Sequence, residues 1–294
     1  MKTVEAFETK ISDVGGLQGA FDFCQDLAVR HYENFPVASL LLPKGKRKHV
    51  AVLYAFARIA DDFSDEPEYE GVRRERLHDW RKQLEAVGEA PPRHPVFLAM
   101  GQTLKELDLP KQPFDDLLSA FLQDTEKRRY ETWDEVLDYC RRSANPVGRI
   151  VLMIHGYRDE DRFRMSDAIC TALQVANFLQ DVSVDLKKDR IYLPQQDFRE
   201  FGYSEADLRM GVVNERFRNL MKLEWKRTRS LFEQGRPLWS TLSWPLSWEI
   251  KLTWLGGCEI LRKVDQLGFD TLSQRPKLRK IDWAGLILKG LTRP

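Results

Sequence analysis

Apolar residues recur every three or four positions along most of this 294-residue chain, while the alternation typical of β-strands is nearly absent. That spacing is the period of an α-helix with one buried face. We therefore predict an all-α protein, larger than a four-helix bundle. Helices are expected at residues 17–33, 44–66, 71–87, 95–107, 113–129, 132–156, 160–186, 214–234 and 245–268.

Prolines and glycines supply the breaks between these helices. Pro146 falls inside one of them, so a kink or a divided helix is expected there. Residues 187–204, KKDRIYLPQQDFREFGYS, are expected to form a loop. Because the sequence shows no internal repeat, low-complexity tract or linker, we predict a single domain over residues 1–294, with 1–16 and 271–294 peripheral.

Composition limits the partners, the kinds of cysteine site and the cellular compartment that we expect for this protein. The formal net charge of +1 gives no overall field that would attract nucleic acid, and no nucleic-acid partner is expected. The four cysteines are far apart and form no CxxC pair, which argues against a zinc site or a disulfide framework. The N-terminus does not resemble a signal peptide, and no apolar run reaches the roughly 18 to 20 residues needed to cross a bilayer. A cytoplasmic protein is expected, with a peripheral contact to the inner membrane left open.

A first acidic cluster ends the segment YAFARIADDFSDE, residues 54–66. In a helix, Asp61 and Asp65 lie about 40° apart and share a face, while Asp62 points about 100° away from Asp61. Like charges on one face repel, and the C-terminal end of a helix disfavours anions. The cluster is therefore not explained by stability, although acidic pairs also occur on ordinary solvated helices.

A second polar cluster lies in QVANFLQDVSVDL, residues 174–186. Gln174, Asn177, Asp181 and Asp185 follow one another at spacings of three, four and four, on one stripe of a helix that is otherwise apolar. Such a stripe is expected to line a cavity. Facing the first cluster, it would offer oxygen ligands of the kind that Mg²⁺ uses when it bridges to a diphosphate. A buried hydrogen-bonded network between helices is the alternative.

Together the two clusters resemble those of the head-to-head isoprenoid synthases, the family of squalene, phytoene and dehydrosqualene synthases. The family's DDxxD motif is matched by DDFSD, residues 61–65, and its second motif by QVANFLQDVSVD. RIYLP, residues 190–194, and the mid-chain FLQDTEKRRYETWDEV also look like family segments. The likeness runs from about residue 20 to 270. It implies an all-α isoprenoid-synthase fold around a deep central cavity, where Mg²⁺ meets the diphosphate of a polyprenyl substrate.

The resemblance also implies a role for individual residues. The implied catalytic residues are Asp61, Asp65, Asp181, Asp185 and Tyr54. The implied magnesium ligands are Asp61, Asp65, Asn177, Asp181 and Asp185. The implied substrate-binding residues are Arg58, His31, Asn34, Phe35, Gln174, Asn177, Arg190 and Tyr192.

Three departures from the family pattern concern the site that binds diphosphate in the family. HYENFPVAS, residues 31–39, stands where the synthases that condense two prenyl diphosphates usually have Ser-x-Ser-Phe. NFLQD places Gln180 where they usually have an arginine. Asn145 and Pro146 replace a small, glycine-containing stretch. Loss of one cation and two hydroxyls would alter a site built for two diphosphates.

These variants resemble the hydroxysqualene synthases of bacterial hopanoid pathways. The resemblance implies Mg²⁺-assisted loss of diphosphate from presqualene diphosphate, rearrangement of the cation, and capture by water. Asn145 is the best candidate for holding that water, and no NADPH is expected. Two alternatives stay open: a presqualene diphosphate or squalene synthase that condenses two farnesyl diphosphates, and a non-catalytic assembly factor on the same fold. Contact with neighbouring hopanoid-pathway enzymes also stays open.

Overall fold

The computed structural model describes residues 3–31 and 43–292. Within these ranges the chain forms helices and no β-strand, which confirms the predicted all-α fold class. The chain divides into two compact units, each with its own core: residues 1–126 with 146–159, and residues 127–145 with 160–294. The predicted single domain and its central cavity stay predictions.

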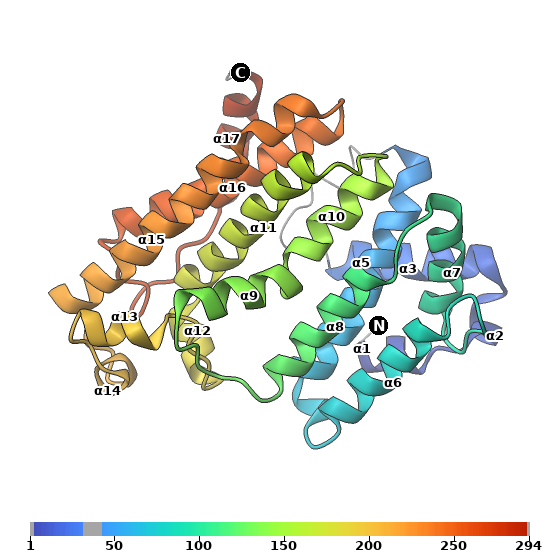
Figure 1. Cartoon of the computed structure of the whole chain (residues 1–294), viewed down its shortest axis with the longest axis horizontal. Coiled ribbons are helices and arrows are strands. Elements are labelled where there is room, and N and C mark those ends of the chain that lie inside the picture. Colours follow the sequence, from blue (N-terminus) through green and yellow to red (C-terminus); the bar gives the residue numbers. More distant parts are fainter. Residues whose placement is uncertain (1–2, 32–42, 293–294) are drawn as a thin grey trace. The chain divides into compact units, whose positions relative to one another are not determined.

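The first unit contains the first acidic cluster. Its elements are α1 (Thr3–Glu8), α2 (Ile11–Val14), α3 (Leu17–His31), α5 (Lys44–Asp65), η1 (Pro67–Tyr69), α6 (Arg73–Glu85), α7 (Pro95–Leu107), α8 (Gln112–Asp124) and all but the first residue of α10 (Asn145–Ile154) (Figure 1).

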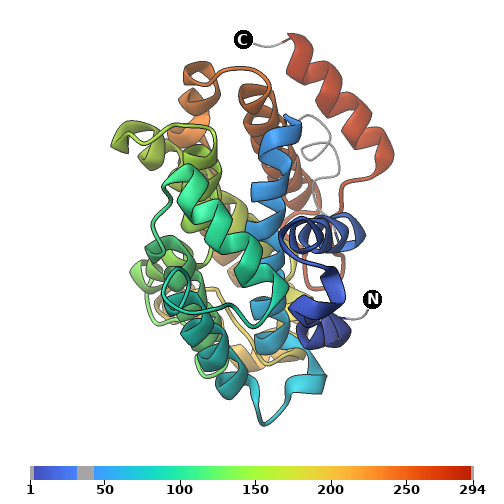
Figure 2. The ribbon, with the colours of Figure 1, turned by 90° about the vertical axis from the view of Figure 1, so that its right-hand side faces the viewer.

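Helix α5 forms the centre of this unit, where it packs against α3, α6, α7 and α8. Figure 2 shows it between α3 and α7. Its buried face carries Phe56, whose carbonyl accepts a hydrogen bond of 3.3 Å from the indole of the fully buried Trp80. The Trp80 ring in turn meets that of Phe97, with centroids 4.5 Å apart. Burial of these aromatic rings fixes the rotation of α5, and with it the direction of the acidic cluster.

The second unit contains the second polar cluster. Its elements are α9 (Trp133–Ser143), α11 (Glu160–Gln180), α12 (Val182–Lys187), α13 (Gln195–Glu200), α14 (Glu205–Arg209), α15 (Glu215–Gly235), η2 (Arg236–Thr241), α16 (Leu246–Gln266) and α17 (Lys280–Thr292) (Figure 1).

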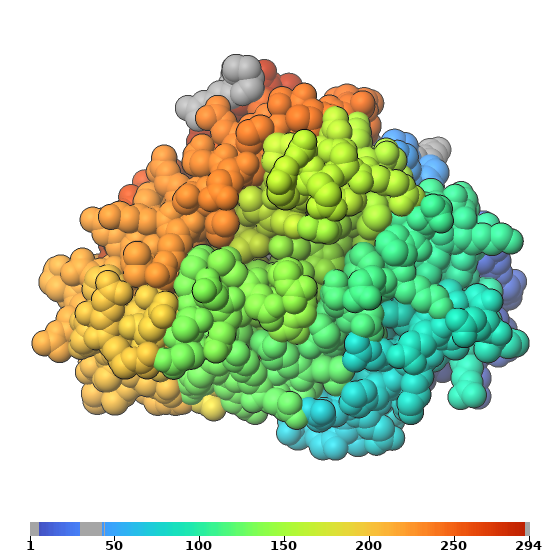
Figure 3. All heavy atoms as spheres, in the orientation of Figure 1, coloured from blue at the N-terminus to red at the C-terminus, as the bar shows by residue number. Residues whose placement is uncertain are grey.

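Helix α11 packs along α15 and also contacts α16 and α9. Short α13 is held against α15 by charge: the guanidinium of Arg227 lies 2.6 Å from both Asp197 and Glu224, and both carboxylates are buried. Figure 3 shows α13 and α14 (yellow) directly beside α15 (orange). Burial raises the pKa of Glu224 to about 8, so near neutral pH the buried charge that needs a partner is that of Asp197, which Arg227 supplies. The cluster therefore ties α13, in the segment after the second polar cluster, to α15.

Three expected elements differ in the structure. The helix expected at 113–129 ends at Asp124, because the backbone beyond it pairs elsewhere: the amide of Ile191 donates to the carbonyl of Arg128 at 2.9 Å. The loop expected at 187–204 contains α13, because Phe198 is buried there alongside Asp197. The helix expected at 160–186 is interrupted at Asp181, where φ is −108° and ψ is 15°.

Other boundaries agree with the sequence. The break expected near Pro146 is found: α9 ends at Ser143 and α10 begins at Asn145. The remaining long helices begin and end within a few residues of their expected positions. Helices α1, α2 and α17 lie in terminal segments for which no helix was predicted.

Candidate functional site

The first acidic cluster belongs to a stripe of candidate site residues along α5. Tyr54, Arg58, Asp61 and Asp65 are all partly exposed, while the positions between them, such as Asp62, are mostly buried. Their spacings of four, three and four place them on one face of the helix. The structure thus places on one face of α5 the four residues for which the sequence predicts a catalytic or substrate-binding role.

Arg58 has a second role that the sequence did not reveal. Its guanidinium lies 3.7 Å from Asp61 but only 2.5 Å from Asp62, whose side chain is 1% exposed. Burial acts to lower the pKa of Arg58, and the two aspartates more than offset this, so that its pKa is raised. Arg58 therefore stays charged and compensates a buried carboxylate, in addition to facing the exposed stripe.

The second polar cluster begins on α11. Gln174 and Asp181 are partly exposed and Asn177 is exposed, so the polar stripe is accessible on this helix. Asp185 is also partly exposed, but it belongs to α12, beyond the break at Asp181. The four residues therefore do not share one continuous helix, and the expected stripe is correct only as far as Asp181.

Arg275 is a partner of this cluster that the sequence did not suggest. It lies in the C-terminal segment that was expected to be peripheral, yet its guanidinium contacts both carboxylate oxygens of Asp181, with 2.9 Å between Nη2 and Oδ2. Next to it, the buried amide of Gln180 donates to the carbonyl of Pro276 at 2.6 Å. These contacts with residues 275–276 lie at the break in the helix at Asp181. No local sequence pattern could have identified a partner 94 residues away.

Beyond α12 the chain folds back on itself. The backbone amide of Arg190 donates to the carbonyl of Asp185 at 2.9 Å, and Asp185, Arg190 and Tyr192 line one small hollow. The Tyr192 ring stacks on Phe178 of α11, with centroids 3.8 Å apart and planes 2° from parallel. The structure therefore brings together three predicted site residues of the second unit and fixes one of them by stacking.

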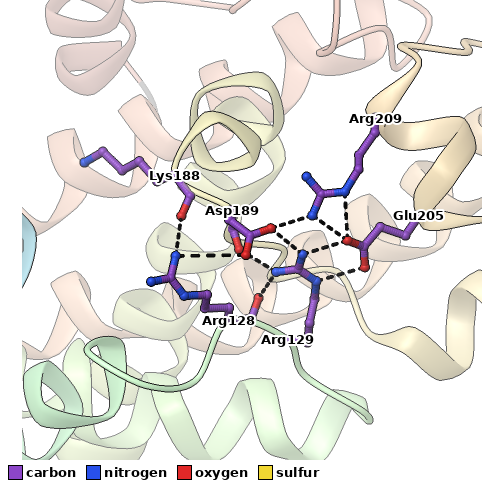
Figure 4. A network of polar contacts seen from close by, with 6 residues as sticks. All are labelled: Arg128, Arg129, Lys188, Asp189, Glu205 and Arg209. Carbon is purple, nitrogen blue, oxygen red and sulfur yellow. Dashed lines mark hydrogen bonds and ion pairs between the residues drawn. The ribbon is translucent and has the colours of Figure 1, made fainter.

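A polar network holds this return segment in place (Figure 4). Arg129 donates to both carboxylate oxygens of Glu205, at 2.9 and 2.7 Å, and to Asp189 at 2.7 Å. Arg209 contacts the same two carboxylates. Arg129, followed by Arg209, holds the pKa of Asp189 at about 2, and Arg129 holds that of Glu205 at about 2 against the opposing effect of burial. The network thus anchors Asp189, next to Arg190, to α14.

This network predicts an acid-dependent contribution to stability. Replacing Arg129 by Gln should lower the melting temperature at pH 7. The pKa values of Asp189 and Glu205 are lower in the folded protein than their ordinary values of 3.8 and 4.5. The two carboxylates therefore stabilise the fold at a pH above these ordinary values, and this stabilisation is lost as the pH falls through about 2. The difference in melting temperature between wild type and variant should therefore shrink as the pH is lowered from about 5 to about 2. Arg164→Gln, which removes an exposed ion pair with Asp161, should show no such trend, and a gap independent of pH would contradict the prediction.

The remaining predicted residues fall in two groups. Asn145 is buried at the start of α10, and its Oδ1 accepts a hydrogen bond of 2.9 Å from the hydroxyl of Thr171 on α11. Asn34, Phe35 and the side chain of His31 lie outside the part of the chain that the structure describes.

The donor set fits a magnesium ion only in part. Among the described residues, no three His, Cys, Asp or Glu side chains gather closely enough to hold a metal ion. Each unit nevertheless offers two partly exposed aspartates, and Asp181 already binds a cationic group in Arg275. Mg²⁺ is usually held by one or two carboxylates together with waters and substrate phosphates. The residues present fit that kind of binding and not a complete cage of protein ligands.

Comparisons with known proteins agree with these motifs. The model of the squalene/phytoene synthase family matches residues 28–282. A hydroxysqualene synthase from Rhodopseudomonas palustris is 34% identical over 254 residues, 85% of each chain. A phytoene synthase from Arthrospira platensis is 29% identical over 269 residues, 87% of each chain. The crystal structure of squalene synthase HpnC from Alicyclobacillus acidocaldarius has a TM-score of 0.82 and 41% identity, and the match covers 86% of this chain and 95% of that one.

The family match spans both aspartate-rich segments and most of the described chain. Members of this family process isoprenoid diphosphates and in general depend on a divalent metal. The motifs, the all-α fold and the similarities lead to one conclusion: the chain belongs to the squalene/phytoene synthase family.

Proposed function

We propose that this protein is a hydroxysqualene synthase, which converts presqualene diphosphate and water into hydroxysqualene and diphosphate. The observation that carries the proposal is Gln180, at the position where synthases that condense two prenyl diphosphates usually have an arginine. Its amide is buried and donates to the carbonyl of Pro276. An uncharged side chain with an internal partner offers no positive charge to a second diphosphate, so a single-diphosphate substrate is favoured. The 34% identity to a hydroxysqualene synthase supports the same activity.

The charged residues of both clusters are proposed to act on the diphosphate. Asp61, Asp65, Asp181 and Asp185, with Asn177, would hold Mg²⁺, which neutralises charge on the departing group. Arg58 and Arg190 are proposed to bind phosphate oxygens directly, because the planar guanidinium matches their geometry. Tyr54 lies one turn before Arg58 on the same exposed stripe and is proposed to act beside the leaving group. Gln174 and Tyr192 are proposed to contact the substrate.

The proposed reaction needs one water in an otherwise apolar environment. Breaking the carbon–oxygen bond to diphosphate leaves a cyclopropylcarbinyl cation, which rearranges and opens its ring. The oxygen of water then bonds to the allylic cation, and one proton leaves with the released diphosphate. A held water requires about two to four polar partners, and we propose the amide of Asn145, oriented by Thr171, as one of them.

Asn145→Ala is expected to change the product more than the rate. Without the amide, presqualene diphosphate should still be consumed, but hydroxysqualene should give way to dehydrated or rearranged hydrocarbons. Product analysis by gas chromatography and mass spectrometry measures the ratio. Thr171→Val, which removes only the orienting hydrogen bond, should cause a smaller shift. Hydroxysqualene alone at the native rate from the Asn145→Ala protein would show that Asn145 is structural.

One incubation tests the proposed function itself. The protein is given Mg²⁺ and either presqualene diphosphate or farnesyl diphosphate, without NADPH, and the lipid products are identified. Hydroxysqualene from the first substrate and no product from the second is the expected result. Presqualene diphosphate formed from farnesyl diphosphate would instead establish a condensing synthase and overturn the proposal.

A further inference from the structure

Helix α17, the last element of the chain, is fixed to α16 by one face. Leu286 is buried, and Gly290 lies so close to the ring of Trp248 that a Cβ atom there would come within 2.7 Å of it. Lys263 pairs with Asp282 at 3.0 Å, and Lys251 donates to the carbonyl of Gly290 at 2.8 Å. These contacts at both ends of the helix fix its rotation, and therefore determine which side chains face outward.

The outward face of α17 is apolar. Ile281, Leu288 and Leu291 are 78%, 63% and 70% exposed, and Ile287 is exposed beside them. At 100° per residue these positions centre on the side of the helix opposite Leu286 and Gly290. Four of the eleven exposed large hydrophobic residues in the described ranges belong to this one helix. A helix that is apolar on two opposite faces, only one of which is buried, indicates an interaction surface.

The chain from the start of α17 onward, with the few residues before it, carries mostly positive charge, although Lys289 lies 4.0 Å from Glu259 of α16. From residue 277 to the C-terminus the sequence contains five basic residues and a single acidic one, Asp282, which is bound to Lys263. Lys277, Arg279 and Lys280 are exposed at the start of the helix. Two copies of the chain meeting through this face would bring like charges together, whereas anionic lipid headgroups would complement them.

An exposed tryptophan extends the apolar surface near the C-terminal end of α17. Trp244 is 75% exposed and lies just before α16. Because Trp248 of α16 contacts Gly290, Trp244 and Leu291 belong to the same end of the α16–α17 pair. Tryptophan is enriched where membranes meet water. The other basic segment, Lys44 to His49, is less suited to this role, because Lys48 pairs with Glu106 and His49 is buried.

We propose that α17 rests on the surface of an anionic lipid membrane, with Ile281, Leu288 and Leu291 in the interface and the basic residues at the headgroups. At 13 residues the helix is about 20 Å long, too short to span a bilayer. No helix in the described ranges has the length and apolarity to cross a membrane. The contact is therefore interfacial, of the kind made by amphipathic helices with a basic flank. Arg275 and Pro276, which bind the second polar cluster, belong to the segment that leads into this helix.

Vesicle flotation of the full-length protein, without substrate, tests the proposal. Wild type should float with vesicles of phosphatidylcholine and phosphatidylglycerol, bind those of phosphatidylcholine alone more weakly, and be released by salt. Leu288→Ser with Leu291→Ser should weaken binding by about tenfold for each leucine. Met210→Ser, which changes a similarly exposed apolar residue directly after α14, should bind as wild type does. Arg279→Gln with Lys280→Gln should weaken binding to the anionic vesicles only.

Three results would overturn the proposal: no binding of wild type to either vesicle, unchanged binding of the double leucine variant, or a wild-type dimer that this variant dissociates in analytical ultracentrifugation. The last would identify the surface as a contact between two copies of the chain. Both leucines are exposed, so the variants should keep the wild-type melting temperature. Because vesicle binding is measured without turnover, its outcome is independent of the proposed activity.

Discussion

Replacing any one of Asp61, Asp65, Asp181 or Asp185 by Asn should lower kcat/KM by about 10²- to 10³-fold while leaving the protein folded. The side chains keep their shape but lose the negative charge that is proposed to hold Mg²⁺ against the diphosphate. Because all four are partly exposed, none is needed to fill a core. Turnover with presqualene diphosphate and thermal unfolding are the two measurements, and the dependence of turnover on Mg²⁺ concentration is a third. The variants should require more Mg²⁺ than wild type does.

The control for this series is Asp115→Asn. Asp115 also accepts hydrogen bonds from a guanidinium, that of Arg81, through both carboxylate oxygens, and it is similarly exposed, but it belongs to neither cluster. Its loss removes a surface ion pair, so any effect should be confined to a small change in stability. Asp181→Asn should show the same small change, because it weakens the contact with Arg275, in addition to the loss of turnover. Near-normal turnover in all four site variants would contradict the proposed metal site.

The fold was predictable where local rules decide the structure. Long amphipathic helices were located from their period, and Pro146 correctly predicted the division of one of them, because proline acts through local sterics and a missing donor. Helix α14 carries a local signal that could have located it: Ser204 and Asp207 form a capping box. Helix α17 was missed for a different reason. Apolar residues on two opposite faces blur the 3.6-residue period, so the sequence of this helix does not show which face is buried.

The candidate site was predictable in its residue types but not in all of its contacts. Asp61 and Asp65 were placed correctly on one face, since their spacing alone determines it. The helix expected to carry Asp185 ends at Gln180, and Asp185 lies on α12, beyond a break where residues 275–276 bind the side chains of Gln180 and Asp181. Contacts between residues far apart in sequence depend on tertiary packing, which periodicity does not encode. Arg129 and its network could not be predicted for the same reason.

Arg58→Met should destabilise the protein by about 2 to 4 kcal/mol, somewhat less than the loss of one partner of a fully buried ion pair. Arg58 is 31% exposed, but its partner Asp62 is 1% exposed and would keep a buried charge with its closest cation gone. Arg58→Lys preserves the charge and should restore most of the stability. Urea unfolding of the three proteins measures both effects. No difference in stability between Arg58→Met and wild type would show that the Asp62 carboxylate is compensated by other groups.

A double variant separates this structural role from the proposed diphosphate contact. In Arg58→Met with Asp62→Asn, the buried charge is removed together with its partner, so most of the lost stability should return, and the double-mutant cycle should show strong coupling. Turnover should not return, because the guanidinium fork is still missing. Arg58→Lys should likewise be stable but slow, since a point charge cannot make the bidentate contact. If Lys and Arg support equal turnover, Arg58 serves Asp62 alone and the diphosphate is bound by other residues.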